Sequence, residues 1–398
     1  METDPIQRAL ILRRTLKEGD KILVVDFSDT LQGKDTSRVI DLMPNVKTGE
    51  YLFRAKVNVK DIDPIAAPEY GKQFVDVSTM SDSEIEDFVK RQEFDFPLWF
   101  KHVPGFNIRN ILDYNPPFVL QVAGCNFHDG KKSGGCWYCF VDDKSNNGQP
   151  GKGKTQLTID DTIDSFIGAR EKVSTFYKEN NTDLKLRVLR ASGGEPTIVL
   201  DWVLELWRRI SKRGLDIVGQ IDTNLSTGQV IETFEQAKIY EKHILEKLAE
   251  HPVKVLAALK GVDNRNLQES VQAKTTVEEQ KYSLKKLIKA GLDVFIQLYN
   301  PNPESLENYL MQMDREVQNF SLKVHIGPLK VYRPTIERLS AEAALRALDA
   351  KALIESAKSQ WDDNYRRSCE VIDYYLRQAH GVGYKDTVRA DVELKVVS

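Results

Sequence analysis

The sequence predicts an α/β protein, a partial (βα)6 parallel barrel with an N-terminal extension and C-terminal helices. The main observation is a repeated order along the chain, in which a short apolar run is followed by an amphipathic helical pattern. Strands joined through helices connect by right-handed crossovers and pair in parallel. The chain holds six such units, too few for a closed eight-fold barrel, so we expect an open or partial one.

Each of the expected strands is a short apolar run, and the first, FVLQVAG, ends in glycine. The runs lie at 118–124, 184–191, 215–221, 253–260, 292–299 and 322–329. Helical patterns follow at 158–180, 200–214, 230–250, 276–290 and 303–318. Thr158 is the expected N-cap of the first helix, and Gly214 and Gly291 are expected to close two of the others. The order therefore places one helix between each pair of neighbouring strands.

The chain of 398 residues is long for one domain, and we expect one principal domain with added segments. The barrel is assigned to 116–330, an N-terminal extension of unknown role to 1–115, and a helical extension to 331–398. Two runs of the N-terminal extension, 21–27 and 51–59, have the pattern of strands, and 81–92 has that of a short helix. The stretch from about 340 to 380 is rich in Ala, Leu, Glu and Arg, which predicts one or two long helices.

The composition is that of an ordinary globular protein. Acidic residues number 59 against 56 basic ones, and 41% of the residues are apolar. This balance provides no electrostatic case for general binding to nucleic acid or to a membrane. Because the sequence begins without a leader pattern and has no apolar run of about 18 residues, we expect a cytoplasmic protein without a membrane partner.

Three of the four cysteines lie in one short stretch, AGCNFHDGKKSGGCWYCFVDD, directly after the first strand. A cluster of this kind indicates metal binding rather than a disulfide framework. Cys125, Cys136 and Cys139 together with His128 offer the four ligands that a structural zinc ion prefers. The three cysteines alone suit an iron–sulfur cluster that leaves one iron open. Cys369 stands apart on an expected helix and is interpreted as structural.

Small polar residues follow three consecutive strands, where sites of parallel α/β folds gather. Gly193 and Gly194 of ASGGEPTI allow close backbone approach to a ligand, and Glu195 suits a cationic group. The next strand ends in Asp222, Thr223 and Asn224, which suit hydroxyls and amines. A third polar cluster, LKGVDN, contains Lys260, which is either catalytic or the end of a strand.

These residues together resemble the radical S-adenosylmethionine superfamily, and most closely its glycyl-radical activating enzyme-like branch. The resemblance covers about 117–330 and is carried by CWYC, GGEP, DTN and ALKGVD. The spacing between Cys125 and Cys136 is longer than the family's usual one. The resemblance implies that Cys125, Cys136 and Cys139 hold a [4Fe–4S] cluster.

It also implies how S-adenosylmethionine is bound. Gly193, Gly194 and Glu195 would meet the methionyl amino group. Asn224 and its neighbours Asp222 and Thr223 would bear on the ribose or carboxylate, and Tyr138 on the adenine. The implied activity is reductive cleavage of S-adenosylmethionine to a 5′-deoxyadenosyl radical that abstracts hydrogen from a substrate. The implied partner is an electron donor such as flavodoxin or ferredoxin, and the substrate is a small molecule or a macromolecule, glycine in a partner protein among the latter.

Two other functions remain open from the sequence. One is a zinc-knuckle binding or scaffold protein that uses Cys125, His128, Cys136 and Cys139. The other is a phosphate-loop nucleotidase, because GQPGKGKT at 148–155 satisfies the G-x4-G-K-T pattern. A phosphate loop joins a buried strand directly to a helix. The residues before this one are polar, which favours a basic surface loop.

Overall fold

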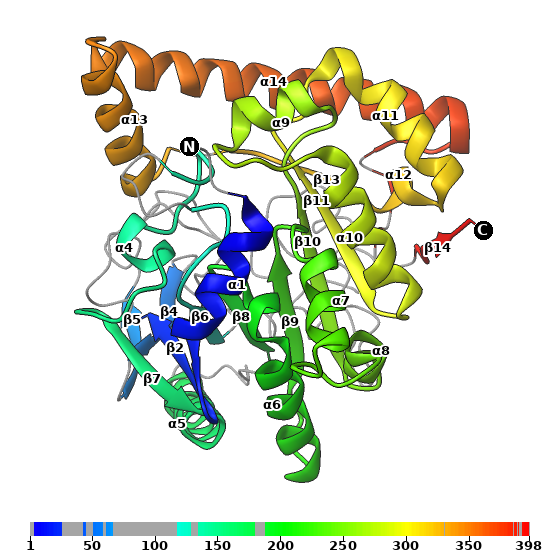
Figure 1. The fold of residues 1–398 in the computed structure, drawn as a ribbon. Coiled ribbons are helices and arrows are strands. Elements are labelled where there is room, and N and C mark those ends of the chain that lie inside the picture. The colour runs from blue at the N-terminus through cyan, green and yellow to red at the C-terminus, as the bar shows by residue number, and fades with distance from the viewer. Residues whose placement is uncertain are drawn as a thin grey trace.

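The computed structural model contains an open, mainly parallel sheet with helices packed against it (Figure 1). It describes residues 4–25, 43–44, 51–58, 61–66, 118–128, 134–179, 188–329, 331–384, 386–387, 389 and 392–397. The predicted fold class is confirmed. Among the described helices, none combines the length and the apolar character needed to cross a bilayer.

The six predicted strands of the barrel are all present and adjacent in the order in which they occur along the chain. They are β6 (Phe118–Val122), β8 (Val188–Gly193), β9 (Val218–Thr223), β10 (Val253–Leu259), β11 (Asp293–Tyr299) and β13 (Val324–Gly327). Every neighbouring pair is parallel. All residues of β6 and β10 are buried, as expected for strands covered on both faces. The carboxyl ends of the six strands therefore lie along one edge of the sheet.

Two of the helices between these strands begin at a residue whose side chain caps the helix. Thr158 accepts a hydrogen bond from the backbone N–H of Asp161 at 3.0 Å, and Thr276 forms a capping box with Glu279. The main helices are α5 (Ile159–Glu179), α6 (Leu200–Lys212), α10 (Val277–Lys289) and α11 (Pro303–Glu316). They match the predicted positions to within a few residues.

One predicted helix is wrong. The residues expected to form a single helix over 230–250 form two, α7 (Gly228–Gln236) and α8 (Ile244–Ala249). Lys238 and His243, between them, have φ angles of 57° and 59°, which a right-handed helix does not contain. The short helix α9 (Asn264–Ser270), capped by Asp263, was not expected from the sequence.

The N-terminal residues take part in the main sheet. Helix α1 (Pro5–Leu16) leads into β1 (Lys17–Glu18) and β2 (Lys21–Val25), and β2 confirms the strand predicted at 21–27. β2 pairs antiparallel with β6 and with β7 (Lys154–Thr158). Strands β3 (Met43–Pro44), β4 (Tyr51–Asn58) and β5 (Asp61–Ala66) form a separate sheet, so the strand predicted at 51–59 is present. The helix predicted at 81–92 lies outside the described residues.

The sequence GQPGKGKT does not have the surroundings of a phosphate loop. Its last residues begin strand β7, and no helix follows them directly. The ammonium of Lys154 donates to Asn147 Oδ1 at 2.8 Å. The backbone arrangement that would present amides and a helix N-terminus to a phosphate is missing here.

The C-terminal region contains two helices, α13 (Arg333–Leu345) and α14 (Ala350–His380), in agreement with the prediction. α14 crosses one end of the molecule and packs on α13 and α11 (Figure 1). Smaller elements complete the chain: η6 (Pro196–Val199), α4 (Asp143–Asn146), α12 (Phe320–Lys323) and the pair β12 (Val317–Gln318) and β14 (Lys395–Val396).

Candidate functional site

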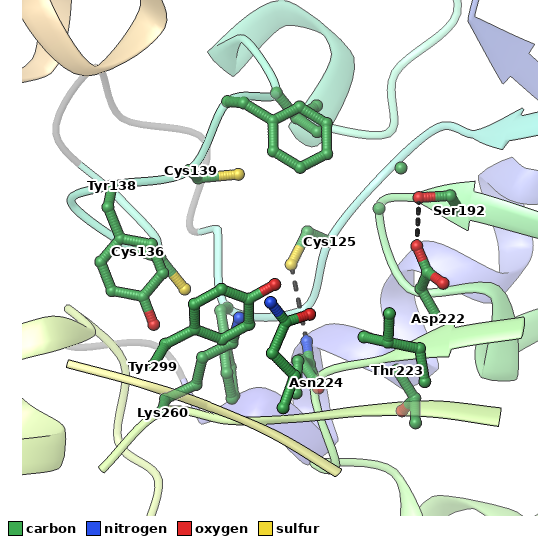
Figure 2. A pocket seen from close by; sticks show the side chains of 18 of the residues that line it. Cys125, Cys136, Tyr138, Cys139, Ser192, Asp222, Thr223, Asn224, Lys260 and Tyr299 are labelled. Carbon is green, nitrogen blue, oxygen red and sulfur yellow. Dashed lines mark hydrogen bonds between the residues drawn. The ribbon is translucent and has the colours of Figure 1, made fainter. Parts of the chain in front are cut away.

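A cavity lies at the carboxyl ends of the parallel strands, with an empty volume of about 1260 Å³ that includes space open to solvent. Its lining contains most of the residues that the sequence singled out. Cys125, Cys136, Cys139, Tyr138, Gly193 and Gly194 line it, and so do Asp222, Thr223, Asn224 and Lys260. Figure 2 shows the three thiol groups facing a common part of this cavity. Glu195 and His128 are not among the lining residues.

The cysteine loop is held by backbone contacts with two other parts of the fold. Cys125 follows β6, and its N–H donates to the carbonyl of Asn146 at 2.9 Å. Cys136 forms a β-bridge with Val271, just after α9. The N–H of Cys139 donates to the carbonyl of Cys136 at 3.1 Å, which closes a tight turn. These contacts bring cysteines from both ends of the loop to one cavity.

The three cysteines are free thiols, and the surroundings of two of them, Cys125 and Cys136, disfavour the thiolate form. Burial raises the pKa of Cys125, and the neighbouring Cys136 and Cys139 raise it further. Burial also raises the pKa of Cys136 to about 11, although the charge of Lys260 acts in the opposite direction. Thiolates in such a place need a compensating positive charge, which bound metal ions supply. The donor set therefore fits a metal group that all three cysteines share.

Two amide side chains approach the sulfur atoms. Asn224 Nδ2 lies 3.7 Å from Cys125 Sγ, and Asn146 Nδ2 lies 3.7 Å from Cys139 Sγ. Hydrogen bonds to ligating sulfurs are one of the factors that set the reduction potential of an iron–sulfur cluster. Asn146 was not predicted from the sequence, because nothing in the local pattern around it distinguishes it from a turn residue.

Arg338 of α13 anchors the cysteine loop from the far end of the chain. Its side chain is 1% exposed and donates to Asp143 Oδ1 at 2.8 Å. Its two terminal nitrogens donate to the carbonyls of Cys139 and Val141. A buried guanidinium that satisfies a carboxylate and two carbonyls fixes the loop on which Cys139 lies.

His128 is not among the residues that line the cavity. Its Nε2 is 3.3 Å from Asp143 Oδ1, and its side chain is 1% exposed. Within the described residues, no three His, Cys, Asp or Glu side chains are grouped so that they could hold a single metal ion. Three cysteine thiols line the cavity, whereas the ring of His128 lies beside the carboxylate of Asp143.

Gly193 and Gly194 stand where two chain segments nearly touch. A Cβ on Gly194 would overlap the carbonyl oxygen of Gly124, and Gly193 has a φ of +98°. The N–H of Gly194 donates to the carbonyl of Val122 at 2.8 Å. A larger residue at either position would clash with β6 or the chain that follows it and push the two strand ends apart.

Glu195 is completely buried beneath the cavity floor. Its Oε2 accepts the N–H of Asn224 at 2.7 Å, and its Oε1 accepts the hydroxyl of Thr197 at 2.6 Å. Burial raises the pKa of Glu195, and these hydrogen bonds oppose the increase. The carboxylate thus joins the loop after β8 to the loop after β9.

Asp222 belongs to a network of polar side chains at the ends of β8 and β9. Its Oδ2 accepts from Ser192 Oγ at 2.6 Å and pairs with Arg190 at 2.7 Å. Its Oδ1 accepts from Gln220 at 2.8 Å. Thr223, beside it, accepts the N–H of Leu225 through Oγ1 at 3.1 Å. The network sets the orientation of the Asp222 carboxylate in the cavity.

Aromatic rings form the opposite wall. Tyr138 stacks on Tyr299 with the ring centroids 5.7 Å apart, and the edge of its ring meets Trp361 of α14. Lys260 Nζ lies 4.6 Å from the centroid of Tyr299 and 5.4 Å from that of Tyr138. Tyr299 was not predicted, because only folding brings it beside CWYC.

Comparisons with family models and with curated proteins find no match. Among solved structures, the cobalamin-dependent S-adenosylmethionine radical enzyme OxsB is similar at 13% identity and a TM-score of 0.36, over 75% of this chain and 37% of that chain. A second match is anSMEcpe with bound AdoMet, at 15% identity and a TM-score of 0.31, over 56% of this chain and 57% of that chain. A third is TYW1 with a lysine-pyruvate adduct bound, at 12% identity and a TM-score of 0.32, over 60% of this chain and 80% of that chain. This chain thus spans much less than two thirds of OxsB. Similarity at such TM-scores does not indicate the function of this chain. The proposal below is therefore based on the residues of the cavity.

Proposed function

We propose that the chain is a radical S-adenosylmethionine enzyme that holds a [4Fe–4S] cluster on Cys125, Cys136 and Cys139. The observation that carries the proposal is the convergence of three thiols, one buried and two partly buried, on one cavity at the carboxyl ends of the parallel strands. Three protein thiolates leave one iron of such a cluster without a protein ligand. A reduced cluster held there would supply one electron to S-adenosylmethionine, and cleavage would give methionine and a 5′-deoxyadenosyl radical that abstracts hydrogen from a substrate.

The zinc-knuckle alternative is less well supported. It needs His128 as the fourth ligand, whereas the His128 ring nitrogen lies 3.3 Å from Asp143 and its side chain does not line the cavity. The phosphate-loop alternative lacks its helix. The iron–sulfur proposal needs only the three cysteines that line the cavity.

In this proposal, the residues around the thiols bind and orient the cofactor. Gly193 and Gly194 line the cavity with backbone alone, which a methionyl group can approach closely. Asp222, held by Ser192 and Arg190, offers an oriented carboxylate to a hydroxyl or an amine. Asn224 donates toward Cys125.

Two predicted roles are modified by the contacts. A direct contact of Glu195 with the cofactor would require its carboxylate to leave Asn224 and Thr197, so we propose that it positions Asn224. Tyr138 remains a candidate for the adenine, although one face of its ring stacks on Tyr299. The electron donor is proposed to be a protein such as flavodoxin or ferredoxin.

The test uses protein reconstituted with iron and sulfide without oxygen. Cys125→Ala, Cys136→Ala and Cys139→Ala should each lose the cluster, because each thiolate holds one iron. Cys369→Ala is the matched control and should keep it, since Cys369 lies on α14 outside the cavity lining. The wild type and the control should form 5′-deoxyadenosine from S-adenosylmethionine with a reductant. Retention of the cluster in Cys136→Ala would contradict the proposal.

A further inference from the structure

We propose that the same cavity contains a subsite for the carboxylate of an organic substrate, formed by the ammonium of Lys260 and the hydroxyl of Tyr138 on the aromatic wall. The inference rests on the proposed function, for which it names a class of substrate. It assigns to Lys260 a role that the sequence left open.

The ammonium of Lys260 pairs with no carboxylate of the described residues. It follows β10 directly, and its backbone N–H is fixed by Gln280 Oε1 at 3.1 Å. Its Nζ contacts the rings of Tyr299 and Tyr138, 4.6 and 5.4 Å from their centroids. In the part of the chain that the structure describes, no carboxylate is within ion-pair distance of it. Contacts with ring faces attract an ammonium but use none of its three hydrogen-bond donors fully.

Tyr138 adds a second donor on the same wall. The residue is only 6% exposed. The residue lines the cavity, and its buried hydroxyl makes no hydrogen bond to any described group. A buried hydroxyl without a partner is costly, and a ligand in the cavity would remove this cost. Figure 2 shows Tyr138, Tyr299 and Lys260 together on one side of the cavity.

The charges of the cavity select a single negative group. The other cation of the lining, Arg190, is paired with Asp222 at 2.7 Å, so one ammonium is left for the ligand. One positive charge matches a carboxylate and leaves a phosphate dianion partly uncompensated. Leu256, Ala258 and Leu329 also line the cavity and give an organic group an apolar surface.

Two other roles for Lys260 make different predictions. It could serve only as a counter-charge to Cys136, whose pKa its charge lowers. It could also bind the carboxylate of S-adenosylmethionine itself. In the first case Lys260 would not distinguish a carboxylate from a neutral amide, and in the second it would affect only the affinity for the cofactor.

The experiment is calorimetric titration of the reconstituted full chain with phenylacetate and, separately, with its uncharged counterpart phenylacetamide. We expect the wild type to bind phenylacetate about tenfold to a hundredfold more tightly, as one charge-assisted hydrogen bond provides. Lys260→Met should abolish this ratio, and Tyr138→Phe, which keeps the ring, should reduce it. Lys152→Met, at an exposed lysine of the surface loop, should leave it unchanged.

Three outcomes would overturn the subsite: no saturable binding of phenylacetate to the wild type, an unchanged ratio in Lys260→Met, or a loss in Lys260→Met confined to S-adenosylmethionine. Iron content and cofactor cleavage are measured on the same samples. A carboxylate preference in protein that binds no iron would defeat the proposed function alone. Normal iron and cleavage without the preference would defeat the subsite alone.

Discussion

Replacing Arg338 by Met should destabilise the protein through the cysteine loop. The substitution keeps a long side chain in α13 but removes the charge that pairs with Asp143 at 2.8 Å and the donors to the carbonyls of Cys139 and Val141. The Arg338 side chain is 1% exposed, while that of Asp143 is 26% exposed. Removing one partner of a buried ion pair costs about 3–5 kcal/mol. The partial exposure of Asp143 places the expected loss toward the lower end of that range.

The assay is urea unfolding of the metal-free chain, so that the result does not depend on a cofactor. A second measurement is the rate at which Cys139 reacts with an alkylating reagent, which should rise as the loop loosens. Arg366→Met is the matched control, because Arg366 is 62% exposed on α14 and pairs only with neighbours on its own helix. A loss of unfolding free energy below about 1 kcal/mol, typical of an exposed pair, would refute the anchoring role of Arg338.

Two further predictions concern carboxylates, the buried Glu195 and the partly buried Asp201. Glu195→Ala should lower the free energy of unfolding by about 1–3 kcal/mol, because it leaves the N–H of Asn224 and the hydroxyl of Thr197 without their acceptor. Glu195→Gln should lower the free energy of unfolding by less. Equal losses of unfolding free energy in the two variants, measured with urea, would contradict this prediction. For Asp201, burial acts to raise the pKa, but hydrogen bonding and charge from Arg13 outweigh it, so the pKa lies below 3.8. The ionised Asp201 carboxylate therefore stabilises the folded state above about pH 3.8, and this stabilisation is lost as the pH falls through the lower folded-state pKa. In Asp201→Asn, the free energy of unfolding measured against pH should no longer fall in this acid range as it does in the wild type. The same decrease at low pH in the variant and the wild type would show that the pair of Asp201 and Arg13 does not cause it.

The sheet was predictable because its parallel strands are mostly buried, and β6 and β10 are buried along their whole length. A strand such as β10, covered on both faces, appears in the sequence as a continuous apolar run. The two helices α7 and α8 were predicted as one because the turn between them is made by Lys238 and His243, residues that carry no glycine or proline signal. The helix α1 was missed although Asp4 followed by Pro5 is a helix-start signal.

The site was predictable only where its residues follow a strand or belong to a short motif. The three cysteines, the glycine pair and Asp222 meet that condition, and they line the cavity together. Arg338 does not, since it reaches Asp143 across 195 positions of sequence. For Glu195, the sequence predicted a cationic partner, whereas in the structure its carboxylate accepts the backbone N–H of Asn224. Which groups a buried carboxylate meets depends on how neighbouring loops pack.

The central claim is that the three cysteines hold iron. Its most direct test is the metal and sulfide content of the full chain purified without oxygen. The account predicts about four iron and four sulfide per chain, with the iron lost in Cys136→Ala and retained in Cys369→Ala. One zinc per chain with no iron, lost on His128→Ala, would contradict it.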